Sequence, residues 1–434
     1  MRTAFSVEQV RRAEAELIAR LPDGELMQRV VVVAGSGDNG GDALFAGARL
    51  ARRGAVVEAV LLDEKRAHSG GLAALRAAGG RAVAAGEWRF SGADLVLDGV
   101  VGIGGRGGLR PAAAAVFEQI ENSVLLAVDI PSGVDADTGE VGDSAVRADV
   151  TVTFGACKPG LLISPGAEHV GELEFVDIGL TLEGAPVLEA LEAADVQALL
   201  PITSAESNKY RRGVVGVAAG SPRYPGAAVL ATGAALRSGV GAVRFVGAPE
   251  VCDGVLAHYP EVLIGTGRVQ SLAEPVPVLV DADGLAALPH PVDRPHPTLL
   301  TPHAGEAARL LGEPWTADRV EARRLEAVRE LADRLRCTVL LKGSTTLIAE
   351  PDRPTVRVNP TGTPALATAG SGDVLSGLAA GLLAAGLSAY DAAAVGAWLH
   401  GQAAHDLLRT HPGRQLIAGD LIEALRAAQP PASR

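Results

Sequence analysis

The chain has 434 residues, of which 48% are hydrophobic and 3% aromatic, and its formal net charge is −12. No apolar run approaches the ~20 residues that cross a bilayer, and no basic stripe or lysine-rich tail occurs, which argues against a membrane protein and against nucleic acid as a partner. The three cysteines lie far apart and the first residues contain no signal-peptide core, so we expect a cytoplasmic, two-domain protein without disulfides or zinc.

The first elements of the chain are typical of a β–α–β unit. Residues 6–21 have the apolar spacing of an amphipathic helix, and four consecutive valines at residues 30–33 predict a strand. The glycine-rich residues 34–42 follow this strand, and residues 43–53 are predicted to form a helix. Strands and helices that alternate in this way build a parallel sheet covered by helices, the α/β class.

The glycine-rich turn after this strand admits two interpretations. Its glycines satisfy the dinucleotide-binding pattern G-x-G-x-x-G, with Glu58 or Asp63, about twenty residues further on, as a ligand for ribose. However, Asp38, Asn39 and Asp42 place three polar groups where the helix of that motif packs tightly. Their oxygens suit a cation or a polar substrate better.

Further strands are predicted at residues 95–97, 124–128, 150–154 and 173–176, and polar residues follow three of them. The first is followed by a glycine-rich loop at residues 99–108, whose single cation is Arg106. Because the carboxyl ends of parallel strands converge on one crevice, we expect five side chains to meet there: Asn39, Asp98, Asp129, Ser132 and Lys158. Each alone could be an ordinary turn residue, but that explanation fits all five poorly.

The composition turns to Glu and Ala between residues 180 and 208, where we place the link between two domains, residues 1–183 and residues 184–434. Residues 188–200 are predicted to form one short helix. The second domain then repeats the order of strand, glycine turn and helix, at residues 214–219, 220–221 and 224–228.

Lysine is rare in this chain. Only four of the 39 basic residues are Lys, and Lys158, Lys209 and Lys342 stand beside glycines or in predicted loops. The compact ammonium group is a common point charge for phosphate, so these three are candidates for binding sites, with ordinary surface lysines as the alternative.

Three later strands, at residues 278–280, 299–300 and 338–341, also end in polar sequences. The first ends at Asp281, and the second leads to His303, which stands close to Glu306. The third leads into a run that could hold a nucleotide phosphate or ribose, or form only a polar hairpin turn: Lys342, Gly343, Ser344, Thr345 and Thr346.

The stretch at residues 359–381 is suited to holding a phosphate. Pro and Gly prevent regular structure before residue 370, and helical spacing begins at Val374, so Gly370, Gly372 and Asp373 lie at a helix N-terminus. Free N–H groups and the helix dipole bind an anion there. The charge of Asp373 would repel a phosphate, unless its carboxylate acts as a base toward a substrate hydroxyl group that receives the phosphoryl group. The alternative is that Asp373 only caps the helix.

Residues 35–42, 98–108 and 129–133 resemble the NAD(P)H-hydrate epimerase family, over roughly residues 1–180. The resemblance implies that this domain interconverts the R and S forms of hydrated NAD(P)H, with Asp129 as a catalytic residue and a potassium ion bound by Asn39, Asp98 and Ser132. Carboxylate, hydroxyl and amide oxygens are hard ligands that suit such a cation. The substrate-binding positions that it implies are Asp38, Asn39, Gly40, Gly41, Asp42, Gly102, Ile103, Gly104, Gly105, Arg106, Gly107, Gly108 and Asp129.

Residues 186–434 resemble the ADP- or ATP-dependent NAD(P)H-hydrate dehydratases, a branch of the ribokinase-like fold, on the motifs at residues 209, 220–221, 301–303, 342–346 and 359–381. The resemblance implies phosphorylation of the 6-hydroxyl of S-NAD(P)HX, with Mg²⁺ bound alongside ADP or ATP, and phosphate loss that restores NAD(P)H. It implies that Asp373 is the base. The implied substrate contacts are Ala227, His303 and Asp373, and the implied nucleotide contacts are Lys342, Gly343, Ser344, Thr345, Thr346 and Gly372.

The whole chain thus resembles the fused bacterial repair enzymes, with two three-layer αβα domains, a Rossmann-like one and a ribokinase-like one, in a homo-oligomer. It departs from the family at two places. The helical segment expected between Met27 and Val30 is missing, and only residues 268–277 stand where the family has a Gly-Pro-Gly loop and a helix. Because a crossover helix needs at least about 10–12 residues, we expect nucleotide binding to survive better than NADHX binding.

Three alternative functions remain open from the sequence. A dinucleotide-dependent dehydrogenase would explain the glycine pattern at residues 35–40, and tight NADH binding without turnover of hydrated NADH would indicate it. A sugar or vitamin kinase would explain the second half, and a stable phosphorylated product would indicate that. A non-catalytic sensor of NAD(P) metabolites would explain the two departures from the family.

Overall fold

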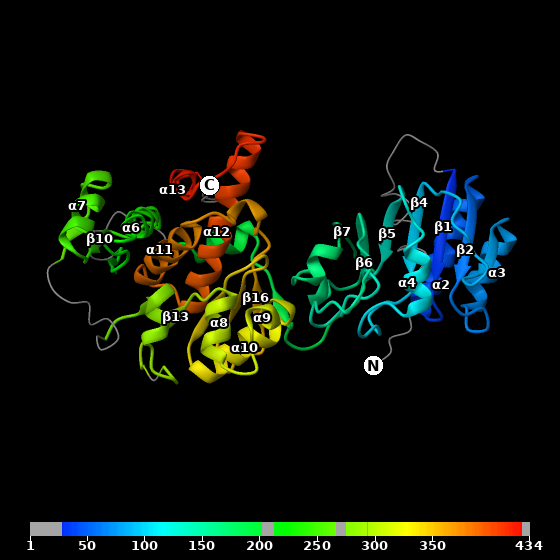
Figure 1. The fold of residues 1–434 in the computed structure, drawn as a ribbon, viewed down its shortest axis with the longest axis horizontal. Coiled ribbons are helices and arrows are strands. Elements are labelled where there is room, and N and C mark those ends of the chain that lie inside the picture. The colour runs from blue at the N-terminus through cyan, green and yellow to red at the C-terminus, as the bar shows by residue number, and fades with distance from the viewer. Residues whose placement is uncertain (1–27, 202–211, 266–274, 293, 428–434) are drawn as a thin grey trace. The chain divides into compact units, whose positions relative to one another are not determined.

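The computed structural model describes residues 28–201, 212–265, 275–292 and 294–427. The chain divides into two compact units, Met1–Gly184 and Ala185–Arg434, and each unit is an α/β assembly (Figure 1). The predicted helix at residues 6–21, Lys209 and most of residues 268–277, the second departure from the family, lie outside the described residues. At the first departure, Gln28 is described and a strand begins at Arg29.

The first unit contains a seven-stranded, fully parallel sheet (Figure 1). The order β3-β2-β1-β4-β5-β6-β7 reverses direction between β1 and β4, which is where α/β sheets open a ligand crevice. The strands are β1 (Arg29–Ala34), β2 (Val56–Leu61), β3 (Arg81–Ala84), β4 (Leu95–Gly99), β5 (Val124–Val128), β6 (Val150–Phe154) and β7 (Glu172–Val176).

The valine run of β1 is buried on both faces of this sheet. Val30 and Val32 belong to a core cluster that contains residues of α2 (Asp38–Arg52) and α3 (Ser69–Ala77). Val31 and Val33 belong to a second cluster, which contains Val116 of α4 (Pro111–Phe117). A parallel sheet covered on both faces needs consecutive apolar residues, which is the pattern that the sequence provides.

Helix α2 begins at Asp38 and not at residue 43 as predicted, so the polar run at residues 38–42 is helical. Gly40 permits this early start, because a Cβ atom at that position would overlap the carbonyl group of Gly35. An acidic residue in the first helical turn, Asp38, also suits the positive end of the helix dipole.

The strands of the second unit form two sheets. The order of the first is β11-β10-β9, and that of the second is β12-β13-β14-β15-β16-β8. No strand pairing joins the two sheets within the described ranges. The strands are β8 (Leu188–Glu189), β9 (Val214–Val217), β10 (Ala242–Phe245), β11 (Leu263–Ile264), β12 (Val278–Val280), β13 (Thr298–Leu300), β14 (Thr338–Leu341), β15 (Leu347–Ala349) and β16 (Val356–Val358).

Helices cover the strands of the second unit, and α6 packs along α11 in the core (Figure 1). The helices are α5 (Ala193–Leu199), α6 (Gly226–Arg237), α7 (Pro249–His258), α8 (Ala304–Leu311), α9 (Ala317–Ala322), α10 (Arg324–Leu335), α11 (Ser371–Ala384), α12 (Ala389–Thr410) and α13 (Ala418–Ala424). Among the described residues, no helix combines the length and the apolar character needed to cross a bilayer.

Two local predictions require correction, and three elements were not predicted. Residues 188–200 do not form one helix, because Leu188 and Glu189 extend as β8 beside β16 and the helix α5 starts only at Ala193. Asp98 lies inside β4 and not after it. Elements β2, β3 and α3 were not predicted individually. The sequences of β3 and α3 are short and rich in Ala and Gly, which carry little periodic signal, and the apolar run of β2 is interrupted by Glu58.

Two candidate active sites at strand carboxyl ends

A buried polar cluster lies where the sheet of the first unit changes direction. Ser132, which follows β5, donates hydrogen bonds from its backbone nitrogen to Asp98 Oδ2 (2.8 Å) and from Oγ to Asp98 Oδ1 (2.7 Å). Asn39 lies in the first turn of α2, and its side chain is next to Gly102 in the loop after β4. A Cβ atom added at Gly102 would be 3.4 Å from Asn39 Oδ1. The structure therefore brings together the three residues that the family resemblance implies as potassium ligands.

The charge and burial of this cluster fit a monovalent cation. The side chain of Asp98 is fully buried, and the cost of that burial raises its pKa to about 6, although hydrogen bonds from Ser132 and Val100 oppose the shift. Within the described part of the chain, Asn39 Nδ2 is buried without a hydrogen-bond partner, which is costly unless an oxygen of the substrate accepts a hydrogen bond from it. One carboxylate with neutral oxygens around it matches a cation of single charge.

Asp129 and Lys158 form an ion pair at the carboxyl ends of β5 and β6. The Lys158 Nζ atom also donates to Thr153 Oγ1 (2.9 Å) and to the carbonyl oxygen of Phe154 (3.0 Å). Each hydrogen bond to the Asp129 carboxylate ends on Oδ1, so Oδ2 faces no partner among the described residues. The backbone φ of Asp129 is +72°, a strained value for a residue with a side chain, and such strain is concentrated at functional sites.

The glycine-rich loop after β4 lies beside the cluster and is partly exposed. Arg106 forms ion pairs with Asp135 (3.0 Å) and Asp137 (2.6 Å), so its charge is compensated within the loop region. Ile103 is 61% exposed, although it is a large apolar residue. A substrate at this loop would therefore meet backbone groups and the exposed side chain of Ile103. The guanidinium group of Arg106 is already paired with two carboxylates.

The second candidate site lies at the N-terminus of α11. Gly370 occupies the N-cap position with a left-handed φ of +88°, and Asp373 is the third residue of the helix. Asp373 therefore does not cap the helix. Burial raises its pKa, the charge of Asp281 raises it further, and Lys342 lowers it.

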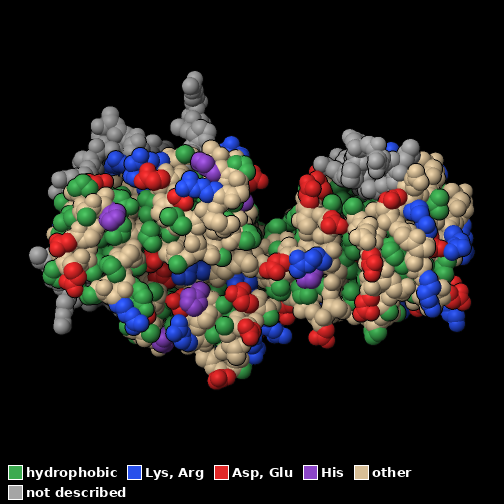
Figure 2. Space-filling view, turned by 45° about the horizontal axis from the view of Figure 1, so that its top comes forward, with side chains coloured by type: hydrophobic (Ala, Val, Ile, Leu, Met, Phe, Trp, Pro, Cys, Tyr) green, Lys and Arg blue, Asp and Glu red, His purple; other side chains and the backbone are tan. Residues whose placement is uncertain are grey.

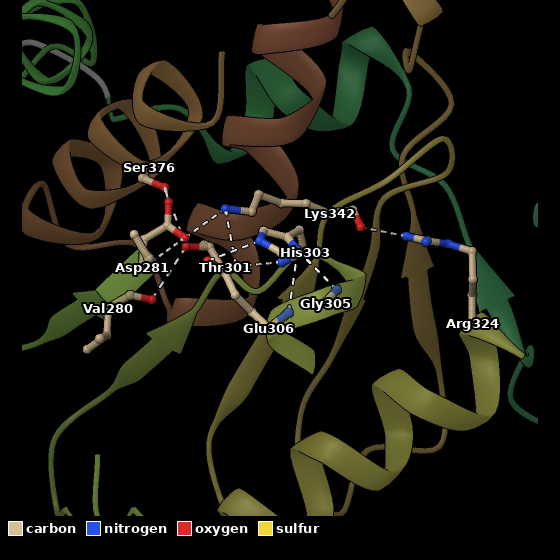
Figure 3. A network of polar contacts seen from close by, with 10 residues as sticks. Val280, Asp281, Thr301, His303, Gly305, Glu306, Arg324, Lys342 and Ser376 are labelled. Carbon is tan, nitrogen blue, oxygen red and sulfur yellow. Dashed lines mark hydrogen bonds and ion pairs between the residues drawn. The ribbon is translucent and has the colours of Figure 1, made fainter. Parts of the chain in front are cut away.

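Lys342 reaches this helix terminus from the end of β14 (Figure 3). Its Nζ atom donates to Asp281 Oδ1 (2.7 Å) and lies 4.0 Å from Glu306 Oε2. A Cβ atom on Gly372 would be 3.6 Å from the same nitrogen. The predicted nucleotide residues Lys342 and Gly372, far apart in the sequence, are thus close together.

His303 caps the helix that follows β13. Its ring Nδ1 accepts a hydrogen bond from the backbone nitrogen of Gly305 (3.0 Å), and its own backbone nitrogen donates to Glu306 Oε2 (2.8 Å). The ring is exposed while it performs this structural role, and Nε2 lies 3.4 Å from Glu306 Oε1. The expected pairing of His303 with Glu306 is present, and the ring remains accessible from solvent.

The residues 342–346 connect β14 to β15 as a hairpin, which is held from beneath by Arg324. The guanidinium group of Arg324 is buried and donates to the carbonyl oxygens of Leu341 (3.2 Å), Lys342 (2.9 Å) and Thr345 (2.8 Å). A Cβ atom on Gly343 would overlap this group. Residues 342–346 can therefore form a hairpin turn and still present their polar groups to a nucleotide.

Ala227 lies in the first turn of α6, at the same end of the unit as Gly370. The start of α11 lies near the start of α6, since a Cβ atom added at Gly370 would meet Leu230. The two helices are also close further along, where a Cβ atom added at Gly381 would meet Ser238, so α6 and α11 run in the same direction. Asp281, Ser376 and Arg324 are not among the site residues predicted from the sequence. Asp281 directly follows a strand, and that position was the signal that could have identified it.

Acidic and basic side chains are interspersed on the face shown in Figure 2, and no extended basic patch is visible there. Within the described ranges, no three His, Cys, Asp or Glu side chains form a cluster that could hold a metal ion.

Two family models match the chain. A model described as NAD(P)H-hydrate dehydratase matches residues 268–426, and a model described as YjeF-related protein N-terminus matches residues 7–160.

Curated relatives align with nearly the whole chain. The bifunctional NAD(P)H-hydrate repair enzyme Nnr of Mycobacterium leprae is 47% identical, over 93% of this chain and 94% of its own length. The enzyme of the same name from Mycobacterium tuberculosis is 46% identical, over 91% and 92%. The solved structure of the ADP/ATP-dependent NAD(P)H-hydrate dehydratase from Bacillus subtilis, co-crystallised with ATP/Mg²⁺, is 30% identical, with a TM-score of 0.51 over 55% of this chain and 96% of that chain.

Proposed function

Because the chain belongs to the family of bifunctional NAD(P)H-hydrate repair enzymes, we propose that residues 1–183 catalyse the epimerisation step and residues 184–434 the dehydration step. The protein repairs hydrated NAD(P)H: it interconverts R- and S-NAD(P)HX and converts the S form to NAD(P)H at the expense of ADP or ATP. The observation that carries this conclusion is the 47% identity to a relative of this name over 93% of the chain.

In the epimerase site we assign proton transfer to Asp129. Inversion at C6 requires a bond to C6 to break and re-form on the other face. Asp129 takes the proton of the C6 hydroxyl group, and the C6–N1 bond breaks with its electron pair on N1 to leave an aldehyde. N1 then bonds to the other face of that carbon as the carboxylate returns the proton to oxygen, and a carboxylate is suited to both transfers. Lys158 occupies Oδ1 of Asp129 and orients the carboxylate, so Oδ2 remains for the substrate. The glycine loop at residues 102–108 and the residues 38–42 would hold the substrate around it.

The oxygens of Asn39, Asp98 and Ser132 would hold a potassium ion at the neighbouring cluster. When bound, this cation would supply a positive charge that stabilises the buried Asp98 carboxylate and fixes the loop after β4. The supporting observation is the burial of Asp98, which raises the pKa of its carboxyl group to about 6, so a bound cation would stabilise the charged form.

In the dehydratase site we assign the role of base to Asp373. Asp373 accepts the proton of the C6 hydroxyl group, the hydroxyl oxygen bonds to the terminal phosphorus of the nucleotide, and the bond from that phosphorus to the bridging oxygen breaks. The C6–O bond then breaks with its electron pair on phosphate, and loss of the C5 proton forms the C5=C6 double bond of NAD(P)H. A hydroxyl group leaves poorly and a phosphate leaves well, which is why the nucleotide is consumed.

The nucleotide would lie against residues 342–346 and Gly372, with its terminal phosphate between Lys342 and the N-terminus of α11. Free N–H groups at that terminus bind phosphate oxygens, and magnesium would neutralise part of the phosphate charge. Ala227 and His303 would contact the NAD(P)HX substrate. Ala227 lies in the first turn of α6, and His303 caps the N-terminus of α8.

We further propose that the enzyme acts in the cytoplasm as a homo-oligomer. Phe175 on the edge strand β7 is 49% exposed, and an exposed aromatic residue on an unpaired edge supports self-association. Sedimentation velocity would test this point, and a monomer at micromolar concentration would contradict it.

One assay tests the proposed function as a whole. R- and S-NADHX are supplied separately with ATP or ADP, and the appearance of NADH is followed by its absorbance. Both epimers should yield NADH completely. Tight NADH binding without turnover would favour a dehydrogenase, and a stable phosphorylated product would favour a small-molecule kinase.

A further inference from the structure

We propose that Asp281 is a positioning residue of the dehydratase, which holds the Lys342 ammonium group against the N-terminus of α11 for phosphoryl transfer. This inference rests on the proposed function of the second unit. Neither the family resemblance nor the sequence patterns assigned a role to Asp281.

Asp281 lies at the centre of a polar network formed by three separate segments (Figure 3). It follows β12 directly, and its Oδ1 atom accepts hydrogen bonds from Lys342 Nζ (2.7 Å) and from the backbone nitrogen of Ala282 (2.8 Å). Its Oδ2 atom accepts from Ser376 Oγ (2.7 Å), in the second turn of α11. The carboxylate therefore links the end of β12, the end of β14 and helix α11.

The ion pair between Lys342 and Asp281 is largely buried, unlike an ion pair on the protein surface. The side chains of Lys342 and Asp281 are only 18% and 16% exposed. A charged hydrogen bond in such surroundings is shorter and stronger than one in bulk water. Glu306 is the competing carboxylate, but its oxygen is 4.0 Å from Lys342 Nζ, so Asp281 determines where the ammonium group lies.

Placement matters because a lysine side chain is a flexible stem that carries a point charge. Without Asp281, the Lys342 ammonium group would be free to turn toward Glu306, away from Gly372 and the anion site. Misplacement of a catalytic charge by about 1 Å can cost a factor of roughly 100 in rate. The residue after Asp281 supports a functional role, since Ala282 has a strained φ of +50°.

Asp281 also acts on the base. The charged groups that face Asp373 are Asp281 at the end of β12 and Lys342 at the end of β14, and Glu306 and His303 of the α8 terminus lie behind Lys342. His400 of α12 hydrogen-bonds the backbone of Ser371 beneath the same terminus and is neutral near pH 7. Removing the charge of Asp281 therefore lowers the pKa of Asp373.

The test is a double-mutant cycle in the full-length enzyme, with S-NADHX and ATP. Asp281→Asn keeps the shape of the side chain but removes its charge, so kcat should fall about 30-fold or more, with a melting temperature within a few degrees of wild type. The matched control is Asp283→Asn, an exposed neighbour, which should leave kcat unchanged. If Asp281 acts through Lys342, the pair Asp281→Asn and Lys342→Met should be no slower than Lys342→Met alone.

A second readout separates positioning from simple structural support. The acidic limb of the rate profile, which reports ionisation of Asp373, should move to lower pH in Asp281→Asn. Additive losses in the cycle, or an unmoved acidic limb, would overturn the role of Asp281. An inactive wild-type enzyme would instead overturn the proposed function of this unit.

Discussion

The carboxylate of Asp373 works as a base only if its pKa is not too low, and its surroundings meet that need. Partial burial and the charge of Asp281 raise the pKa, while Lys342 opposes the shift. Gly370 already caps α11, so the position of Asp373 in the helix is not explained by capping. The pKa of Asp373 therefore suits the role of base that we propose for it.

Replacing Asp373 by Asn tests this assignment. The substitution keeps the shape and removes the base, so dehydration of S-NADHX should fall by about 100-fold or more. Because Asp373 makes no capping hydrogen bond, the melting temperature should change little. Asp420→Asn in the first turn of α13 is the matched control and should retain full activity. Wild-type turnover in Asp373→Asn would end the assignment.

The cluster of Asn39, Asp98 and Ser132 predicts that epimerisation depends on a monovalent cation of potassium size. Rates should be high in potassium chloride and low in tetramethylammonium chloride at equal ionic strength, because the organic cation is too large for a buried carboxylate site. Asp98→Asn should abolish this dependence. Equal rates in the two salts would refute the cation site.

His400 predicts a pH effect on the stability of the second unit. Its ring is buried, and burial lowers its pKa from 6.5 to about 4, so the folded state keeps it neutral while the unfolded chain binds a proton below pH 6.5. The associated stability is fully present above pH 6.5 and is lost as the pH falls from 6.5 toward 4. At pH 5 the free energy of unfolding should be lower by about 2 kcal/mol than it is above pH 6.5.

The measurement for His400 is urea unfolding of wild type and His400→Gln, followed by tryptophan fluorescence at pH 7.5 and pH 5. The stability advantage of wild type over the variant should shrink at pH 5. An advantage that is equal at both pH values would show that His400 is not buried and neutral.

At the scale of elements, the hairpin of β14 and β15 shows how a binding loop is made rigid. Arg324, the first residue of α10, satisfies three carbonyl groups of the loop at residues 341–345 with one guanidinium group. Burial lowers the pKa of Arg324, and its contact with Glu321 opposes the shift. The loop therefore keeps its shape before a nucleotide arrives, which reduces the entropy lost on binding.

Gly343→Ala tests this support. A methyl group at residue 343 would press on the guanidinium group of Arg324, and the backbone φ of +154° is also unfavourable for Ala. Calorimetry should show ATP affinity reduced about 10-fold, with epimerase activity unchanged. Gly254→Ala in α7, where a Cβ atom meets no neighbour, is the control and should bind ATP normally. Normal ATP affinity in Gly343→Ala would show that the contact does not shape the loop.

The elements with strong patterns were predictable, and those with weak patterns were not. The valines of β1 and the apolar spacing after Asp373 identified a strand and a helix because burial on a fixed face imposes a period. The start of α2 was placed too late, since its first turn is made of polar residues and glycines that favour turns by local propensity. Most of residues 268–277, the segment on which it rests, lies outside the described residues, so the expected preference for nucleotide over NADHX binding stays a prediction.

At the scale of the whole molecule, the two units repeat one design. In each, a carboxylate at the end of a strand or at a helix terminus faces a lysine: Asp129 faces Lys158, and Asp281 faces Lys342. The rule that ligands lie beyond strand carboxyl ends made the first set predictable from sequence. Asp281 also follows a strand, but Asp-Ala-Asp-Gly at that place is equally typical of an ordinary turn, so its position alone did not distinguish it.

Under the proposed assignment the two units act on one small molecule in succession, so their activities should be separable. Asp129→Asn should remove epimerisation and leave dehydration of S-NADHX, while Asp373→Asn should do the reverse. Since NADHX diffuses freely, the two variants do not need to be part of one chain to cooperate.

The most direct measurement supplies R-NADHX with ATP to each variant alone and to an equal mixture of both, and follows NADH absorbance. Each variant alone should form little NADH from the R epimer, and the mixture should convert it completely at a rate approaching that of wild type. Failure of the mixture to form NADH, or loss of S-NADHX dehydration in Asp129→Asn, would contradict the assignment of one activity to each unit.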